Sequence, residues 1–192
     1  MKHLLLHSCC APCSPYVIRK LAEEYRVTVF FYNPNIHGPA EYELRLTEIR
    51  RLCAALGVEL IEGGYDPDRY FARVGPLAFS GEGGERCSEC FRLRLEEACQ
   101  VARQIGASVV ATTLSVSPHK KTRQINSQGR SAAGKYEGLA FLEADFKKKE
   151  GYRISCELSR EYGFYRQNYC GCIFSKAESE RRDNTDPAPP RG

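Results

Sequence analysis

Three short cysteine motifs hold seven of the chain's ten cysteines. They occupy residues 9–13 (CCAPC), 87–90 (CSEC) and 170–172 (CGC). The seven thiols belong to Cys9, Cys10, Cys13, Cys87, Cys90, Cys170 and Cys172. They outnumber the four ligands that a tetrahedral zinc site takes. Sulfur donors in this number indicate an iron–sulfur cluster, with a second metal or a redox-active thiol pair beside it.

Each motif lies at an expected loop or helix start, outside any apolar stripe. Cys87 and Cys90 are spaced so that both point one way at a helix start, a pattern shared by zinc and redox sites. Cys170 and Cys172 have a glycine between them. They could bind one metal or form a strained, easily reduced disulfide. The motifs together therefore predict metal binding, and iron–sulfur is favoured over structural zinc.

The remaining cysteines are Cys53, Cys99 and Cys156, which we expect to be small buried hydrophobes. A disulfide framework is typical of small secreted domains with an export signal. Residues 1–8 read instead as a first strand, because their apolar run is very short for a signal peptide. These features predict a cytoplasmic protein with reduced thiols.

Composition indicates one soluble globular domain. The chain has 192 residues, of which 42% are hydrophobic and 27% charged. It contains no run approaching the roughly 20 apolar residues of a membrane helix, so we expect no membrane partner. Residues 119–153 contain nine Lys or Arg against four Asp or Glu. This segment could contact phosphates, or it could be an ordinary solvated face.

Apolar runs and turn signals predict an alternation of strands and helices. The expected strands are 2–8, 27–32, 58–61, 108–113 and 139–142. The expected helices are 14–24, 41–56, 66–74, 87–105, 122–133 and 152–162. This order predicts an α/β fold with a parallel sheet flanked by helices, over a domain of residues 1–176. Residues 177–192 are charged and proline-rich, and are predicted to be a disordered tail.

Ligands of such sheets bind beyond the carboxyl ends of the strands. Residues 7–13, 33–38 and 112–121 each follow a predicted strand. The first cysteine motif, an asparagine-rich loop and a basic loop should therefore meet at one edge of the sheet.

The chain closely resembles the QueH-type epoxyqueuosine reductases. The resemblance rests on an ordered set of motifs within residues 3–175. The motifs are 7–13 (HSCCAPC), 32–37 (YNPNIH), 41–42 (EY), 87–90 (CSEC), 112–114 (TTL), 117–120 (SPHK), 145–148 (DFKK), 159–161 (SRE) and 165–172 (YRQNYCGC). In that family the position of Cys13 is cysteine or aspartate, so it either tolerates a sulfur or an oxygen ligand or binds no metal.

The resemblance implies a single domain of the HUP type, a modified nucleotide-binding fold. It implies reduction of epoxyqueuosine to queuosine at the tRNA wobble position, the last step of queuosine biosynthesis. It also implies a [4Fe–4S] cluster with an adjacent iron, and an external electron donor. An SGGKDS-type pyrophosphate loop is absent after the first predicted strand, where residues 7–13 stand instead. We therefore expect no use of ATP.

Two predicted helix starts carry cysteine pairs that should meet at the active edge of the sheet. We predict that Cys9, Cys10, Cys87 and Cys90 are the cluster ligands. The predicted ligands of the second metal, or members of a catalytic thiol pair, are Cys13, Cys170 and Cys172. The candidate proton donors for the epoxide oxygen are Asp145, Glu41, His37 and Tyr169.

The basic segment would hold the tRNA backbone. The predicted contacts are Lys120, Lys121, Arg123, Lys147, Lys148 and Lys149. Candidates for stacking on an unpaired base are Tyr32, Tyr42, Tyr165 and Tyr169. Two other functions remain open: an iron–sulfur tRNA sulfur transferase of the same fold, and a zinc-stabilised RNA-binding module.

Overall fold

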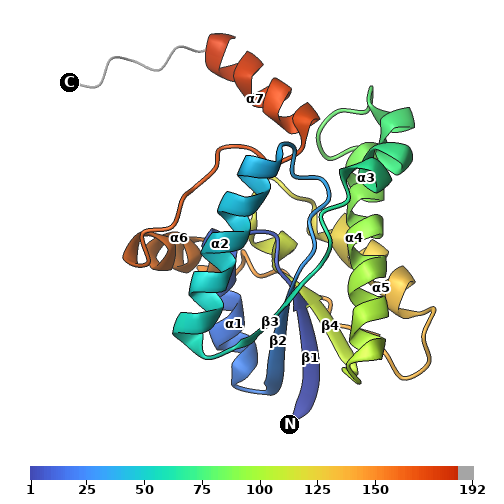
Figure 1. Ribbon diagram of the computed structural model, residues 1–192, viewed down its shortest axis with the longest axis vertical. Helices are drawn as coiled ribbons and strands as arrows, with labels where there is room; N and C mark the ends of the chain where they lie inside the picture. Colours follow the sequence, from blue (N-terminus) through green and yellow to red (C-terminus); the bar gives the residue numbers. More distant parts are fainter. Residues whose placement is uncertain (186–192) are drawn as a thin grey trace.

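A five-stranded parallel sheet, in the order β3-β2-β1-β4-β5, forms the centre of the computed structural model (Figure 1). The structure describes residues 1–185. The strands are β1 (Lys2–His7), β2 (Tyr25–Phe31), β3 (Glu59–Glu62), β4 (Val109–Thr112) and β5 (Ala140–Phe141). β1 pairs with β2 from Lys2 opposite Tyr25, and with β4 from Leu4 opposite Val109. The predicted parallel α/β fold is confirmed.

Seven α-helices connect and cover the strands in the described part of the chain. They are α1 (Ser14–Ala22), α2 (Pro39–Leu56), α3 (Pro67–Val74), α4 (Glu85–Gln104), α5 (Thr122–Ala133), α6 (Gly151–Glu161) and α7 (Ile173–Thr185). Short 3₁₀ turns lie at η1 (Ala11–Cys13), η2 (Gly75–Leu77) and η3 (Thr113–Val116). None of the helices among residues 1–185 combines the length and apolar character of a membrane-spanning segment.

The sheet separates two hydrophobic cores. Successive side chains of a strand point to opposite faces. Leu4 and Leu6 of β1 therefore pack with α1 and α2, whereas Leu5 packs with α4 and α5. All three leucines are fully buried. Figure 1 shows the result, with α1, α2 and α6 on one side of the sheet and α4 and α5 on the other.

The C-terminal helix differs from the sequence prediction. Residues 177–185 were expected to be disordered, but they continue α7, which begins at Ile173 and extends away from the body (Figure 1). The Lys, Ala, Glu and Arg residues within its sequence are good helix formers. Glu178 of α7 forms an ion pair with the buried Arg86 of α4 at 2.8 Å, which anchors the helix. The rest of the predicted tail, 186–192, lies outside the described residues.

Candidate metal centre and adjoining cavity

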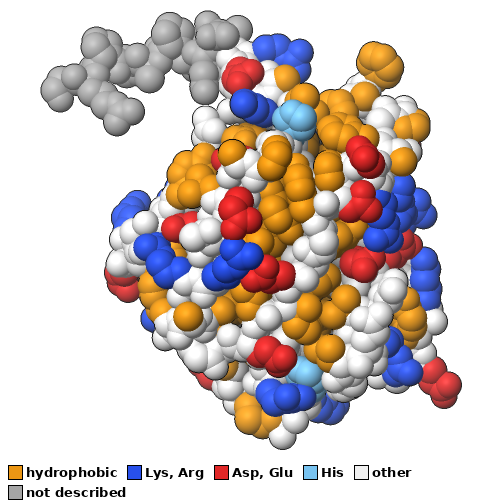
Figure 2. All heavy atoms as spheres, viewed as in Figure 1, with side chains coloured by type: hydrophobic (Ala, Val, Ile, Leu, Met, Phe, Trp, Pro, Cys, Tyr) orange, Lys and Arg blue, Asp and Glu red, His pale blue; other side chains and the backbone are white. Residues whose placement is uncertain are grey.

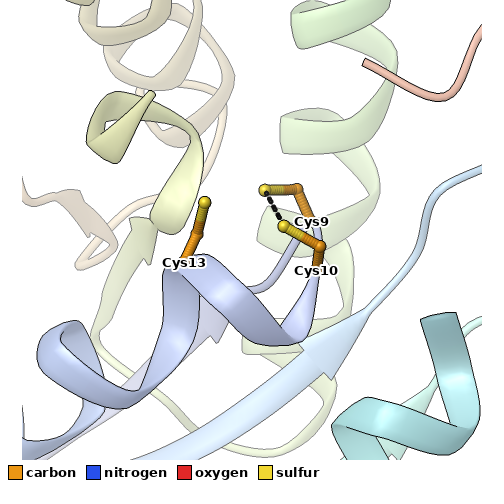
Figure 3. A group of neighbouring side chains, drawn as sticks. All are labelled: Cys9, Cys10 and Cys13. Atoms are coloured by element: carbon orange, nitrogen blue, oxygen red, sulfur yellow. Dashed lines mark hydrogen bonds between the residues drawn. The ribbon is translucent and has the colours of Figure 1, made fainter. Parts of the chain in front are cut away.

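Cys9, Cys10 and Cys13 form the first group of thiols, directly after the central strand β1. Their sulfur atoms all lie within 4.8 Å of one another. The Sγ atoms of Cys9 and Cys10 are 3.7 Å apart (Figure 3). Three sulfur donors so close together, from a single turn of chain, could hold one metal ion.

Local sequence explains this compact turn. Pro12 and Pro15 lie in the first turns of η1 and α1, where proline is favoured because its fixed φ suits a helix start. The Ser14 hydroxyl donates to the Cys10 carbonyl at 2.8 Å. The backbone N–H of Cys9 donates to Thr113 Oγ1 at 3.1 Å. The thiol-bearing turn is therefore fixed to both α1 and the end of β4.

The second group comprises the other two motifs. Cys87 and Cys90 lie in the first two turns of α4, and Cys170 and Cys172 lie just before α7. All four line one small cavity, and Lys120 lies on its wall. The Cys172 thiol accepts a hydrogen bond from the backbone N–H of Ser175 at 3.3 Å, in the first turn of α7. Segments 80 residues apart in sequence thus place their thiols together.

Gly171 makes the position of the last motif possible. Its φ is 114°, which favours glycine, and an added Cβ would lie 2.9 Å from Arg45 Nη1. The Gly171 carbonyl accepts the backbone N–H of His37 at 2.8 Å. The Cys170 carbonyl accepts Arg45 Nη1 at 3.2 Å. The loop after β2 and helix α2 therefore hold this motif at the carboxyl edge of the sheet.

A larger open cavity of about 570 Å³ adjoins the small one. The first thiol group lines it, and Cys170 and Lys120 line both cavities. Another wall is the segment 166–169, which contains Tyr169. All three cysteine motifs and the loop after β4 therefore meet around two adjoining spaces.

The thiols differ in acidity. Hydrogen bonds from Cys10 and Cys13 hold the pKa of Cys9 well below its usual value. Burial raises the pKa of Cys90 to about 12. Burial lowers the pKa of Lys120, but the thiols of the 9–13 and 170–172 motifs outweigh this and raise it. Metal binding at such a site would release protons from the neutral thiols.

The grouping of thiols differs from the one expected from sequence. Cys13 lies with Cys9 and Cys10, whereas the expected cluster set joined the first two residues of that motif to Cys87 and Cys90. A turn of 3₁₀ helix brings Cys13 back over the preceding thiols, and spacing alone did not indicate this turn. Cys53 and Cys99 are buried as predicted, but Cys156 is only half-buried.

Of the four residues predicted to donate a proton to the epoxide oxygen, Tyr169 lines the larger cavity. Asp145 lines neither cavity, and its Oδ1 is 3.6 Å from the ammonium of Lys147. Glu41 is in an ion pair with Arg45 at 2.6 Å. His37 is exposed on the loop after β2.

The candidates for base stacking and for phosphate contacts differ in how exposed their side chains are. Tyr32 and Tyr42 are core residues, 3% and 5% exposed, and are not free to stack on a base. Lys121 donates to the Gly83 carbonyl, and Lys147 donates to the Lys120 carbonyl and the Thr122 hydroxyl. The exposed members of the basic set are Lys121, Arg123, Lys148 and Lys149.

Charges on the face shown in Figure 2 are mixed. Blue and red side chains lie beside one another there. Ion pairs of the described chain include those of Arg50 with Glu43 and Glu62, at 2.6 and 2.7 Å. Within the lysine-rich segment, Arg130 and Lys135 pair with Glu143 and Glu96 at 2.8 and 2.6 Å, and Lys147 lies 3.6 Å from Asp145. Only part of the positive charge of this segment is therefore left for phosphates.

Two buried arginines near the thiols escaped the sequence analysis. Arg94 is 1% exposed and Arg45 is 3% exposed. The available signal was spacing, because Arg94 follows Cys90 by four residues and so shares its helix face. Tyr70, also fully buried, contacts the Cys172 thiol and was missed because α3 carries no cysteine.

Comparison with known proteins supports the reading of the motifs. The family model described as "Epoxyqueuosine reductase QueH" matches residues 4–178. Proteins named epoxyqueuosine reductase QueH from Haemophilus influenzae and Streptococcus pyogenes are each 38% identical, over 93% and 90% of this chain and 73% and 69% of their own lengths. The protein of that name from Thermotoga maritima is 35% identical over 95% of this chain and 94% of its own.

A solved structure shares the fold. It is the U34-tRNA thiolase NcsA from Methanococcus maripaludis with its [4Fe-4S] cluster, with a TM-score of 0.53 and 12% identity. The alignment covers 95% of this chain and 65% of that one, so it supports the architecture alone. The sequence relationships are more specific, and with them the predicted resemblance is confirmed: the chain belongs to the epoxyqueuosine reductase QueH family.

Proposed function

We propose that this protein reduces epoxyqueuosine to queuosine at the wobble position of tRNA, with electrons passed through a metal centre held by the cysteine motifs. The observation that carries the proposal is the meeting of seven thiols around two adjoining cavities in a member of this family. Conversion of an epoxide into an alkene and water consumes two electrons and two protons. A pair of thiols could supply these electrons only by closing a disulfide, which an external donor must then reduce. We infer that a metal centre at the thiols passes the electrons from that donor.

The donor set fits an iron–sulfur centre. Thiolates are soft ligands that suit iron–sulfur clusters, and a [4Fe–4S] cluster takes four of them. Seven thiols would hold such a cluster and an adjacent iron ion. The fully buried guanidinium of Arg94, whose Nε has no hydrogen-bond partner, also fits a centre with negative charge. When bound, a centre of this kind supplies electrons singly and a Lewis acid for the epoxide oxygen.

The residues of the chain bind the substrate and hold a proton beside it. The larger cavity, of about 570 Å³, is in the size range of small-ligand sites and would take a nucleoside. Burial, and then the Glu41 carboxylate, raise the pKa of Tyr169, so its phenol stays protonated at neutral pH. Tyr169 is therefore our candidate for donating a proton to the leaving oxygen. Asp145, which lines neither cavity, is not supported in that role.

The test is an anaerobic assay. Protein purified without oxygen should contain iron and sulfide and be coloured. With a chemical reductant and no ATP, it should convert epoxyqueuosine in tRNA to queuosine, as measured by mass spectrometry of digested tRNA. Turnover that requires ATP and adds sulfur would indicate a sulfur transferase instead. A colourless zinc protein that binds tRNA without turnover would contradict the proposed reductase.

We expect the exposed lysines of the basic segment to hold the tRNA backbone. Changing both Lys148 and Lys149 to glutamine should weaken tRNA binding. It should also reduce the slope of log K against log salt concentration by about one to two, since each phosphate contact contributes about 0.7–0.9 to that slope. Fluorescence anisotropy over a salt series would measure this.

Lys135→Gln is a control, because the Lys135 ammonium is already paired with Glu96 at 2.6 Å. A salt slope that stays the same in the double variant would show that Lys148 and Lys149 are an ordinary solvated face.

A further inference from the structure

The buried side chain of Arg94 joins the second thiol group to the end of the central strand. Its Nη2 donates to Asn33 Oδ1 at 2.5 Å, and its Nη1 lies 3.9 Å from the Sγ of Cys90. The amide of Asn33 in turn donates to the Ser8 carbonyl at 2.9 Å, one residue before the first motif. Arg94 and Asn33 therefore form a buried link between the motifs at 9–13 and 87–90.

The charge of Arg94 lacks a carboxylate partner. Three arginines are buried in the described chain, and two of them are in ion pairs: Arg45 with Glu41, and Arg86 with Glu178. No ion pair between residues 1–185 includes Arg94, whose hydrogen-bond acceptors are an amide and a thiol. A buried charge without a counter-charge is strongly destabilising.

The groups in a position to balance that charge are thiols. Arg94 lies 3.9 Å from the Cys90 thiol and lines the larger cavity together with Cys9 and Cys170, so one cysteine of each motif lies near it. These cysteines would be thiolates once metal is bound. The cation is thus placed where the proposed centre would carry negative charge, and where burial strengthens the interaction.

We propose that Arg94 is a positioning residue of the metal centre, whose fixed charge makes the bound centre easier to reduce and whose link to Asn33 sets the distance between two cysteine motifs. This inference rests on the proposed function, because it requires a redox centre at the thiols. A cation close to a redox centre favours the state with one more electron, since added negative charge is stabilised by attraction.

Two substitutions separate the charge from the hydrogen bond. Arg94→Gln removes the charge and keeps a shorter side chain that can still form hydrogen bonds, whereas Arg94→Lys keeps the charge and loses the planar guanidinium. Asn33→Asp is nearly isosteric and gives the guanidinium a carboxylate partner. The matched control is Arg92→Gln, on the same helix, because the Arg92 side chain is 49% exposed and already pairs with Glu89.

The measurements are an anaerobic redox titration of the loaded protein followed by electron paramagnetic resonance, its iron and sulfide content, and the melting temperature of the metal-free protein. Arg94→Gln and Asn33→Asp should each disfavour reduction at least tenfold, a negative potential shift of about 59 mV for one electron. Arg94→Lys and Arg92→Gln should titrate near the wild type. The melting temperature of metal-free Asn33→Asp reports two opposing changes, because the buried cation gains a carboxylate partner while the N–H donor to the Ser8 carbonyl is lost.

Unchanged potentials in Arg94→Gln and Asn33→Asp, with full iron content, would overturn the inference. If Arg94→Gln does not fold, Asn33→Asp decides the question, since it retains Arg94 and the acceptor for its guanidinium and loses only the donor to the Ser8 carbonyl. Equal loss of melting temperature in metal-free Arg94→Gln and Arg94→Lys, with no change of potential, would assign Arg94 to packing alone. A wild-type protein that binds no redox centre would contradict the proposed function itself, before any variant is compared.

Discussion

Replacing Cys90 with alanine is expected to remove most of the iron and sulfide and to abolish reduction. Cys90 is buried in the wall of the small cavity, so no exposed side chain can take its place. The substitution would also remove the thiol that lies 3.9 Å from Arg94 Nη1. Iron and sulfide analysis, the visible absorption band and turnover would be measured on protein purified without oxygen.

The control for this variant is Cys99→Ala, because Cys99 is fully buried on the same helix but lines neither cavity. Cys99→Ala should keep its metal and activity.

The variant Cys10→Ala then distinguishes the two possible groupings of the thiols, the one predicted from sequence and the one seen in the structure. Loss of the whole cluster would support the set predicted from sequence, whereas loss of a single iron would support the grouping by distance. Full iron and sulfide in Cys90→Ala would exclude it as a ligand.

Gly171→Ala is expected to displace the last cysteine motif and to lower both iron content and turnover severely. The new Cβ would lie 2.9 Å from Arg45 Nη1 and 3.1 Å from Ile36 Cγ1, at a φ of 114°. Backbone strain of this kind costs about 1–3 kcal/mol, and relieving it would shift Cys170 and Cys172 away from the cavity. Iron analysis and thermal unfolding of the metal-free and loaded proteins would measure both effects.

Gly64→Ala provides the matched control, since its Cβ would meet nothing within 4 Å. It should retain iron and activity. An active, fully loaded Gly171→Ala protein would show that the 170–172 motif tolerates movement, and that these two thiols are not held in place for metal binding.

Much of the fold could be predicted from sequence, because its signals are local. Apolar runs bounded by glycine and proline marked the strands, and the helix predicted over 122–133 has those bounds in the structure. The exception is α7, where polar composition predicts disorder although several of the same residues favour helix. The ion pair of Arg86 with Glu178 anchors this helix. That anchor joins residues 92 positions apart, so no local pattern contains it.

The sequence by itself determined which residue types the site would contain: the soft sulfur donors, their three motifs and the family to which they belong. The tertiary structure decided which thiols share a space and what surrounds them. It grouped Cys13 with Cys9 and Cys10, placed Tyr169 at the cavity and left Asp145 away from it. It also buried Arg94 beside the Cys90 thiol and at the cavity that Cys9 and Cys170 line. The reason is physical: spacing along the chain fixes the face of a helix or strand, whereas distances and charge balance between motifs depend on how separate elements pack.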